Sequence, residues 1–263
     1  MFNFVFTPVV KNLLILNLAV FVIDKFLFPL TDLFGLRYIL STMFYPFQFF
    51  TYMFLHADFG HVFFNMFALI MFGPLLERFW GPKKFLAFYL ITGIGAGFLY
   101  SCISFYHMYD LHQAILTYIA HPTPDAFTIF MNKHASGQYY SNYNFINSYA
   151  ENPTDPSYIR ESIDFVNLLF QKKANVPMIG ASGAIFGILM AFGMLFPNTE
   201  LFLFPIPIPI KAWLYVTVYG VIELYSGVRG AEGDNTAHFA HIGGMIFAFI
   251  MIKLWKENRQ DFH

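Results

Sequence analysis

Six long apolar segments, separated by polar or interrupted stretches, dominate the chain. They cover residues 8–30, 60–77, 83–105, 179–196, 211–227 and 238–255. Each is close to the roughly 17–25 residues that an α-helix needs to cross a bilayer. Residues 31–59 are also apolar, but Pro29 and Pro46 interrupt them, which favours a loop embedded in the membrane interface. The pattern predicts an all-α membrane protein with a six-helix bundle.

Residues 106–178, between the third and fourth segments, break this pattern with a long polar and tyrosine-rich stretch. Within it, Asp155-Pro156 can cap and start a helix. The apolar stripe of that helix lies at Ile159, Ile163, Val166 and Phe170, and it would allow the helix to lie on the membrane. Lipid, the bundle or a substrate must cover this face, and we predict that the stretch is a cap or a substrate-docking element. We therefore predict one membrane domain, 1–263, that carries 106–178 as an insertion.

The composition agrees with a membrane protein. Hydrophobic residues make up 57% of the chain and charged residues 12%, whereas a soluble domain carries about 25% charged residues. The 36 Phe and 16 Tyr suit surfaces that face lipid or the interface. A net charge of −1 gives no indication of a nucleic-acid partner, and the single Cys102 excludes an internal disulfide. The lipid bilayer is the expected surrounding.

The basic residues of the short loops predict the orientation. If six segments span, most of these residues lie on one side, which the positive-inside rule makes cytoplasmic. They are Lys11, Arg78, Lys83, Lys84, Lys211, Lys253, Lys256 and Arg259. With no basic region or cleavage pattern ahead of it, the first segment is expected to be an uncleaved span. Both termini should be cytoplasmic, residues 106–178 should lie outside, and a plasma-membrane location is expected.

Polar residues gather at the heads of alternate segments. The second segment begins with His61 and Asn65, four residues apart and therefore on one helix face. The fourth begins with Ser182, and the sixth with His238 and His241. Because these three segments run in the same direction, their heads lie at a common depth near the outer face. Polar groups inside a membrane are costly, so their convergence indicates a functional site.

The residues around Ser182 suit a nucleophile. An imidazole, whose unperturbed pKa is about 6.5, can take the proton of a serine hydroxyl near neutral pH. Gly180 and Gly183 would allow a substrate backbone to approach the hydroxyl, and the unpaired N–H groups of a helix start can bind a developing oxyanion. The nearest acidic residues of the outer loop, Glu232 and Asp234, are expected to be solvated. The predicted machinery is therefore a Ser-His dyad without an acidic third member.

Spacing selects the general base between the two histidines. His241, Gly244 and Ala248 share one helix face, so a second backbone can come close where His241 points. His238 lies one turn nearer the aqueous boundary and is expected to play a supporting role at most. His241 is the predicted base.

Two further assignments concern the other polar residues. His61 and Asn65 carry donors that could bind the oxygen of a tetrahedral intermediate together with the Ser182 backbone N–H. The competing interpretation is a metal site made by His56, His61, His238 and His241. His56 and His61 are five residues apart and would face different sides of a helix, which disfavours that set. No metal or other cofactor is expected.

These residues resemble the rhomboid family of intramembrane serine proteases, across all six segments. The family's Gly-x-Ser-Gly motif matches Gly180-Ala-Ser182-Gly183, its Ala-His-x-x-Gly pattern matches Ala240-His241-Ile-Gly-Gly244, and its His-x-x-x-Asn pattern matches His61-Val-Phe-Phe-Asn65. The resemblance implies Ser182 as nucleophile, His241 as base, and His61 and Asn65 as oxyanion stabilisers. It implies transmembrane helices as substrates, cut near their outer ends at small residues.

Other positions extend this resemblance or depart from it. His56 fits an additional family histidine, and Glu77-Arg78 fits the polar pair that ends the second helix. Many members carry Trp-Arg in the first outer loop, where this chain has Phe47-Gln48. Phe186 stands where some members have Tyr, and we expect it to stack on His241. Residues 106–178 are far longer than the usual connection.

Three rival interpretations remain open at this point. A rhomboid-like pseudoprotease would bind or escort membrane proteins without cutting them, but the joint presence of Ser182 and His241 argues against it. A small transporter is disfavoured because the spans are taken to lack acidic residues for coupling. Finally, Gly183 and Gly187 form a Gly-x-x-x-Gly pair that could serve helix packing alone.

Overall fold

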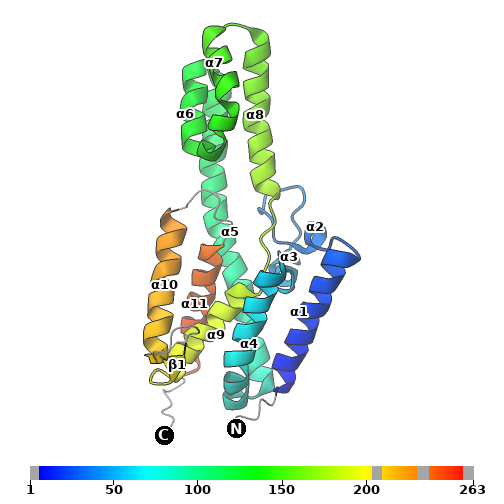
Figure 1. Ribbon diagram of the computed structural model, residues 1–263, viewed down its shortest axis with the longest axis vertical. Helices are drawn as coiled ribbons and strands as arrows, with labels where there is room; N and C mark the ends of the chain where they lie inside the picture. The colour runs from blue at the N-terminus through cyan, green and yellow to red at the C-terminus, as the bar shows by residue number, and fades with distance from the viewer. Residues whose placement is uncertain (1–5, 203–208, 230–236, 257–263) are drawn as a thin grey trace.

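The structure is a computed structural model that describes residues 6–202, 209–229 and 237–256. Within these residues, a helix lies in each of the six predicted segments. The helices are α1 (Pro8–Phe26), α4 (Phe59–Trp80), α5 (Pro82–Ala120), α9 (Ser182–Leu195), α10 (Ala212–Arg229) and α11 (His238–Leu254). They pack into one bundle, in which α1 begins and α11 ends at the same end of the molecule (Figure 1). The prediction of a predominantly helical bundle is confirmed.

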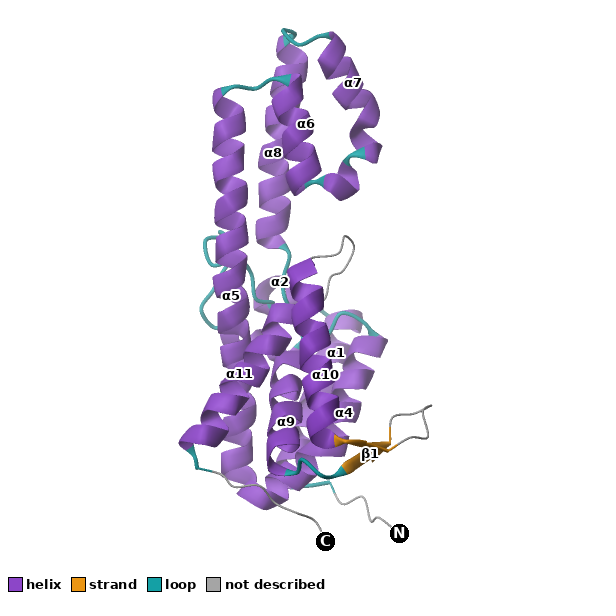
Figure 2. Ribbon diagram, turned by 90° about the vertical axis from the view of Figure 1, so that its left-hand side faces the viewer, coloured by secondary structure: helices purple, strands orange, loops and turns teal. Residues whose placement is uncertain are grey.

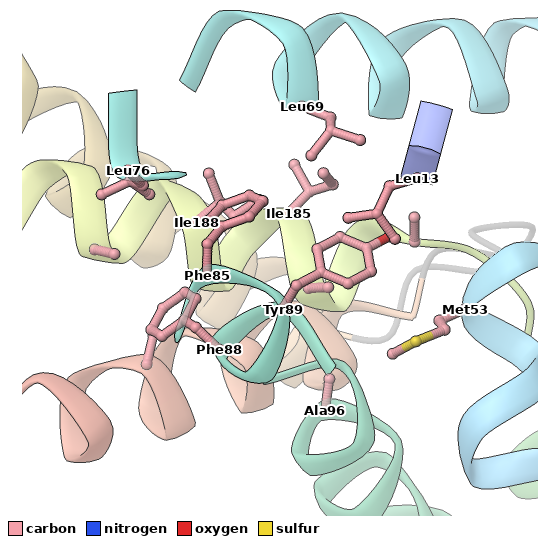
Figure 3. Close-up of a cluster of buried hydrophobic side chains, with 14 of the residues drawn as sticks. Leu13, Met53, Leu69, Leu76, Phe85, Phe88, Tyr89, Ala96, Ile185 and Ile188 are labelled. Atoms are coloured by element: carbon pink, nitrogen blue, oxygen red, sulfur yellow. The ribbon is translucent and has the colours of Figure 1, made fainter. Parts of the chain in front are cut away.

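Helix α9 forms the centre of the bundle. It packs against α4, α5, α10 and α11, and nearly all of its residues are buried. Large side chains from α1, α4, α5 and α9 interlock around it, and Figure 3 shows this cluster. Its members include Leu13, Leu69, Leu76, Phe85, Phe88, Tyr89, Ile185 and Ile188. Ser182 therefore heads the most enclosed helix of the protein.

Glycines set the crossing of α9 and α11. A Cβ placed on Gly244 would lie 1.9 Å from the Gly183 carbonyl oxygen, so the two backbones are in direct contact there. A Cβ on Gly183 would lie 2.5 Å from the Cβ of Ala96 in α5. Only residues without side chains allow this approach. The glycines thus serve packing, and the same contact brings the heads of α9 and α11 together.

The length of the helices bears on how the bundle meets a membrane. Among the described residues, α4 and α5 are long and apolar enough to cross a bilayer by length and composition. Helices α9 and α11 are apolar but have 14 and 17 residues. Protein surrounds α9, so lipid contact does not set its length. Below it, β1 (Glu200–Phe202) pairs with β2 (Pro209–Lys211) in an antiparallel two-stranded sheet.

Residues 31–59 form short helices that lie against the bundle. They are α2 (Thr31–Phe34), α3 (Gln48–Thr51) and the 3-10 turn η1 (Tyr52–Phe54). Gln48 is fully buried and donates to the carbonyl oxygens of Leu33, at 3.0 Å, and Met43, at 2.9 Å. The side-chain amide oxygen of Gln48, Oε1, accepts from the Arg37 backbone N–H at 3.3 Å. Gln48 therefore anchors this loop at the position where the sequence departs from Trp-Arg.

Residues 106–178 fold into helices rather than a structureless loop. Helix α5 continues to Ala120, well past the predicted end of its segment, and three further helices and two 3-10 turns follow. They are α6 (Pro124–His134), η2 (Ser136–Gln138), η3 (Tyr140–Asn142), α7 (Tyr143–Glu151) and α8 (Pro156–Asn175). Together with the end of α5, helices α6, α7 and α8 form a second bundle, called the upper bundle below, that extends from the first (Figure 2).

The upper bundle has an apolar core of its own, which includes Tyr118, Phe127, Tyr149, Val166 and Leu169. Helix α8 begins at the predicted residue, with the Asp155 carboxylate accepting from the Ser157 N–H at 2.8 Å. Its predicted apolar stripe packs into this core instead of lying on the membrane. That expectation was wrong because α5, α6 and α7 offer the stripe a protein surface to cover.

Helix α8 ends in a junction with the first loop. The Arg37 guanidinium donates to the Asn175 carbonyl oxygen and to the Asp32 carbonyl oxygen, the latter at 2.9 Å. Next to this contact, Leu36 and Met178 form an isolated antiparallel β-bridge. The chain then runs directly into Gly180 and Ser182. The upper bundle is thus fixed to the segment that precedes the serine.

Candidate active site

Ser182 and His241 meet at the heads of α9 and α11. The Ser182 Oγ lies 2.8 Å from the His241 Nε2, a hydrogen-bond distance. Phe186, one turn along α9, stacks on the His241 ring with 4.1 Å between centroids and 7° between planes. The stacking predicted for Phe186 is therefore present. This stacking fixes the plane of the imidazole ring, so that its Nε2 points at the Ser182 hydroxyl.

Gly180 shapes the approach to Ser182. Its φ of +132° is a conformation that side chains rarely allow. A Cβ there would lie 2.7 Å from the His61 ring, so the backbone before the serine runs directly past that imidazole. The Gly180 N–H is bonded to the Tyr52 carbonyl oxygen at 3.0 Å. The glycine is required both for the turn and for the closeness of His61.

His61 presents a donor beside the serine. The first turn of α4 is fixed by Asp58, whose carboxylate accepts from the His61 backbone N–H at 2.9 Å. The His61 Nδ1 accepts a long hydrogen bond, 3.4 Å, from the Ala57 backbone N–H. In a neutral imidazole the proton is then on Nε2, the atom that lies near Gly180. The buried His56 ring packs edge-on against His61 at 5.1 Å and helps to hold its orientation.

Asn65 supplies a second donor. Its side chain is only 6% exposed, and its Nδ2 has no hydrogen-bond partner among the described residues. A buried amide without a partner is costly. A polar ligand bound beside it would remove that cost. The Asn65 Nδ2 is therefore available to donate to an oxygen of a ligand in this position.

These residues line one cavity of about 750 Å³. Its walls come from the heads of α4, α9 and α11, from α10 and from the segment that precedes Ser182. They include His61, Asn65, Tyr100, Met178, Ser182, Phe186, Tyr219 and His241. In Figure 1 the heads of α4, α9 and α11 lie at the end of the six-helix bundle, called the lower bundle below, that faces the upper bundle. The cavity lined by these heads is therefore at that end. Residues from the three predicted segment heads are thus brought together.

The site contains an acidic residue that was not predicted from the sequence. Glu223, in α10, is 5% exposed, and its Oε2 lies 2.8 Å from the His241 Nδ1. The same oxygen lies 2.6 Å from the His238 Nδ1. Glu223 belongs to the predicted segment 211–227, where an acidic residue should itself have been taken as a sign of function. Glu232 and Asp234, which were considered instead, lie outside the described residues.

The cluster of Glu223, His238 and His241 could in principle hold a metal ion. One ligand atom from each lies within 4.8 Å of the others. The carboxylate oxygen, however, is 2.6 and 2.8 Å from the two imidazole nitrogens. Two ligands of a tetrahedral zinc ion would be about 3.3 Å apart. Hydrogen bonds therefore account for the spacing better than a shared cation.

Comparison with known proteins decides the family. The Rhomboid domain matches residues 44–118 and 162–257, which is more than half of the chain. The chain belongs to the rhomboid family. Ser182, His241, His61 and Asn65 all lie within the matched ranges, whereas α6 and α7 lie in the gap between them. The family is embedded in membranes, which agrees with the predicted membrane location.

The chain is similar to two curated rhomboid proteins. Rhomboid protein 1, mitochondrial, of Saccharomyces cerevisiae is 31% identical over 86 residues, which are 32% of this chain and 25% of that protein. RHOMBOID-like protein 12, mitochondrial, of Arabidopsis thaliana is 26% identical over 200 residues, which are 75% of this chain and 43% of that protein. This chain thus spans less than half of the length of either relative. Both relatives are named as mitochondrial, so they do not support the predicted plasma-membrane location.

Proposed function

We propose that this rhomboid is an intramembrane serine endopeptidase that hydrolyses peptide bonds of transmembrane-helix substrates. The observation that carries the proposal is the 2.8 Å contact between the Ser182 Oγ and the His241 Nε2 inside a cavity that the unpaired Asn65 Nδ2 also lines. A pseudoprotease would need neither the aligned imidazole nor that donor.

The reaction follows from the atoms in place. His241 Nε2 takes the hydroxyl proton as the Ser182 Oγ attacks the carbonyl carbon of the substrate. The resulting oxyanion is bound by the Asn65 Nδ2, the His61 Nε2–H and the Ser182 backbone N–H. His241 then gives its proton to the leaving amine as the C–N bond breaks. Water, deprotonated by His241, attacks the acyl-enzyme, and the proton returns to Ser182 as the acid product leaves.

Labelling with a serine-reactive fluorophosphonate tests this proposal. The wild-type protein in membrane at neutral pH should be labelled on the peptide that carries Ser182, and Ser182→Ala should remain unlabelled. A folded wild-type protein that is not labelled at Ser182 would favour the pseudoprotease.

The oxyanion role of Asn65 predicts a specific kinetic loss. Asn65→Ala should lower kcat by about 10²–10³-fold, the usual effect of losing one such donor, with little change in KM. Asn17→Ala is the matched control, because Asn17 is buried in α1 and its amide is already bonded to the Leu13 carbonyl oxygen at 2.7 Å. Asn17→Ala should keep kcat in the folded fraction. An unchanged kcat in Asn65→Ala would remove Asn65 from the site.

We further propose that α1, α4, α5, α9, α10 and α11 all span the bilayer and that the upper bundle lies on the side opposite the termini. The family membership, the apolar helices, and Lys11 near the start of α1 with Lys253 near the end of α11 support this arrangement. The cavity would then open to water on the side of the upper bundle, and substrates would be cut near that face.

Cysteine accessibility tests this orientation. In a Cys102→Ser background, a cysteine at the exposed Asn144 of α7 and one at the exposed Lys11 of α1 should react with a membrane-impermeant maleimide from opposite faces of sealed vesicles. Labelling of both from the same face would refute the arrangement.

A further inference from the structure

Glu223 is not a member of the Ser182–His241 dyad, yet it contacts His241. Its Oε2 faces two imidazole nitrogens, the Nδ1 of His241 at 2.8 Å and the Nδ1 of His238 at 2.6 Å. It projects from the same face of α10 as the buried Val216 and as Tyr219, which packs on Phe186 at 5.0 Å. Helix α10 therefore presents the carboxylate to the side of His241 opposite Ser182.

The contact decides the tautomer of His241. An ionised carboxylate only accepts hydrogen bonds, so the His241 Nδ1 must carry a proton to bond with it. In the neutral ring, Nε2 is then left with its lone pair, and that lone pair faces the Ser182 Oγ at 2.8 Å. The opposite tautomer would place an N–H against the hydroxyl and could not take its proton. Glu223 thus holds His241 in the form that can act as a base.

The same oxygen also acts after proton transfer. When His241 becomes an imidazolium, its positive charge lies 2.8 Å from the Glu223 carboxylate in a buried setting, where such an attraction is strong. We infer that Glu223 is a positioning residue that completes a Ser182–His241–Glu223 relay. This inference rests on the proposed protease function.

His238 holds Glu223 in place. A buried carboxylate with one partner would be costly, and the His238 Nδ1 supplies a second donor to the same oxygen. His238 is the first residue of α11, three residues before His241, so one turn of helix carries both donors. This arrangement gives His238 the supporting role expected from the sequence, through Glu223 rather than through the substrate.

Glu223→Gln tests the inference with little change in shape. We expect kcat of the folded protein for a transmembrane substrate to fall by about 10²–10⁴-fold, with KM within about twofold, because the amide can present either of its ends to His241 and no longer selects its tautomer. The rate of fluorophosphonate labelling at Ser182 should fall in parallel. Glu223→Asp should recover part of the loss, and His238→Ala should lose less than Glu223→Gln.

Glu77→Gln is the matched control for a buried glutamate. Glu77 is 2% exposed and accepts from the Val9 and Val10 backbone N–H groups at 3.0 and 2.9 Å, away from the cavity. It should lower the Tm and leave kcat of the folded protein unchanged. If Glu223→Gln behaves in the same way, Glu223 is only a structural link between α10 and α11 and the inference fails.

Three other outcomes are also decisive. A wild-type protein that neither cleaves nor labels would refute the proposed function itself, whereas a wild-type protein that cleaves alongside an equally active Glu223→Gln would refute only the relay. If EDTA inactivated the wild type and zinc restored it, the cluster would be a metal site and the relay would be overturned.

Discussion

Replacing His241 by alanine is expected to lower cleavage of a transmembrane substrate by roughly 10⁴–10⁶-fold. The hydroxyl of Ser182 has no other base at hydrogen-bond distance among the described residues. Ser182→Ala should cause a loss of the same size, and the double variant should be no worse than either single one, because the two groups act as a unit. Initial rates in proteoliposomes measure all three.

His107→Ala provides the control, since His107 is exposed on α5 outside the cavity. It should keep full activity. Thermal unfolding should show that His241→Ala remains folded. Comparable rates for His241→Ala and the wild type would show that another group takes the proton.

Gly244→Ala is expected to damage both the site and the fold. The new Cβ would lie 1.9 Å from the Gly183 carbonyl oxygen and 2.8 Å from its carbonyl carbon, and neither backbone atom can rotate away. Helices α9 and α11 must therefore separate, which moves Ser182 away from His241. A displacement of about 1 Å can cost about 10²-fold in rate, and overpacking typically costs about 1–3 kcal/mol of stability.

Gly220→Ala is the matched control at the neighbouring contact of α10 with α11. There the new Cβ would lie 2.9 Å from the terminal methyl of Met245, which can turn aside. Its cleavage rate and Tm should stay near wild type. A Gly244→Ala variant with the rate and Tm of Gly220→Ala would contradict the close α9–α11 contact.

The sequence was informative wherever local spacing determined the structure. Apolar length predicted the helices of the lower bundle, and the Asp155-Pro156 signal predicted the start of α8. The common direction of three segments predicted that Ser182, His241 and His61 would converge, and they line one cavity. These features depend on periodicity, on capping and on chain direction, all of which can be read along a single helix.

Features that depend on contacts between helices were harder to predict. The α8 stripe was expected to meet lipid because an apolar face shows only that it needs a cover, not which one. Gln48 could not be recognised as an anchor, since its partners Leu33 and Met43 are backbone carbonyl groups of a loop. Glu223 lies within the predicted segment 211–227, but it was not predicted to be a site residue. Its distance to His241 depends on how α10 packs against α11.

The most direct test of the proposed protease function is cleavage of a transmembrane-helix substrate by the purified protein in proteoliposomes, with the cut site determined by mass spectrometry. We expect the wild type to cut one bond within or beside the apolar segment, near the face that carries the upper bundle, and Ser182→Ala to make no cut. Intact substrate with a folded wild-type protein, over a panel of helices with small residues near that face, would contradict it, as would equal cutting by Ser182→Ala.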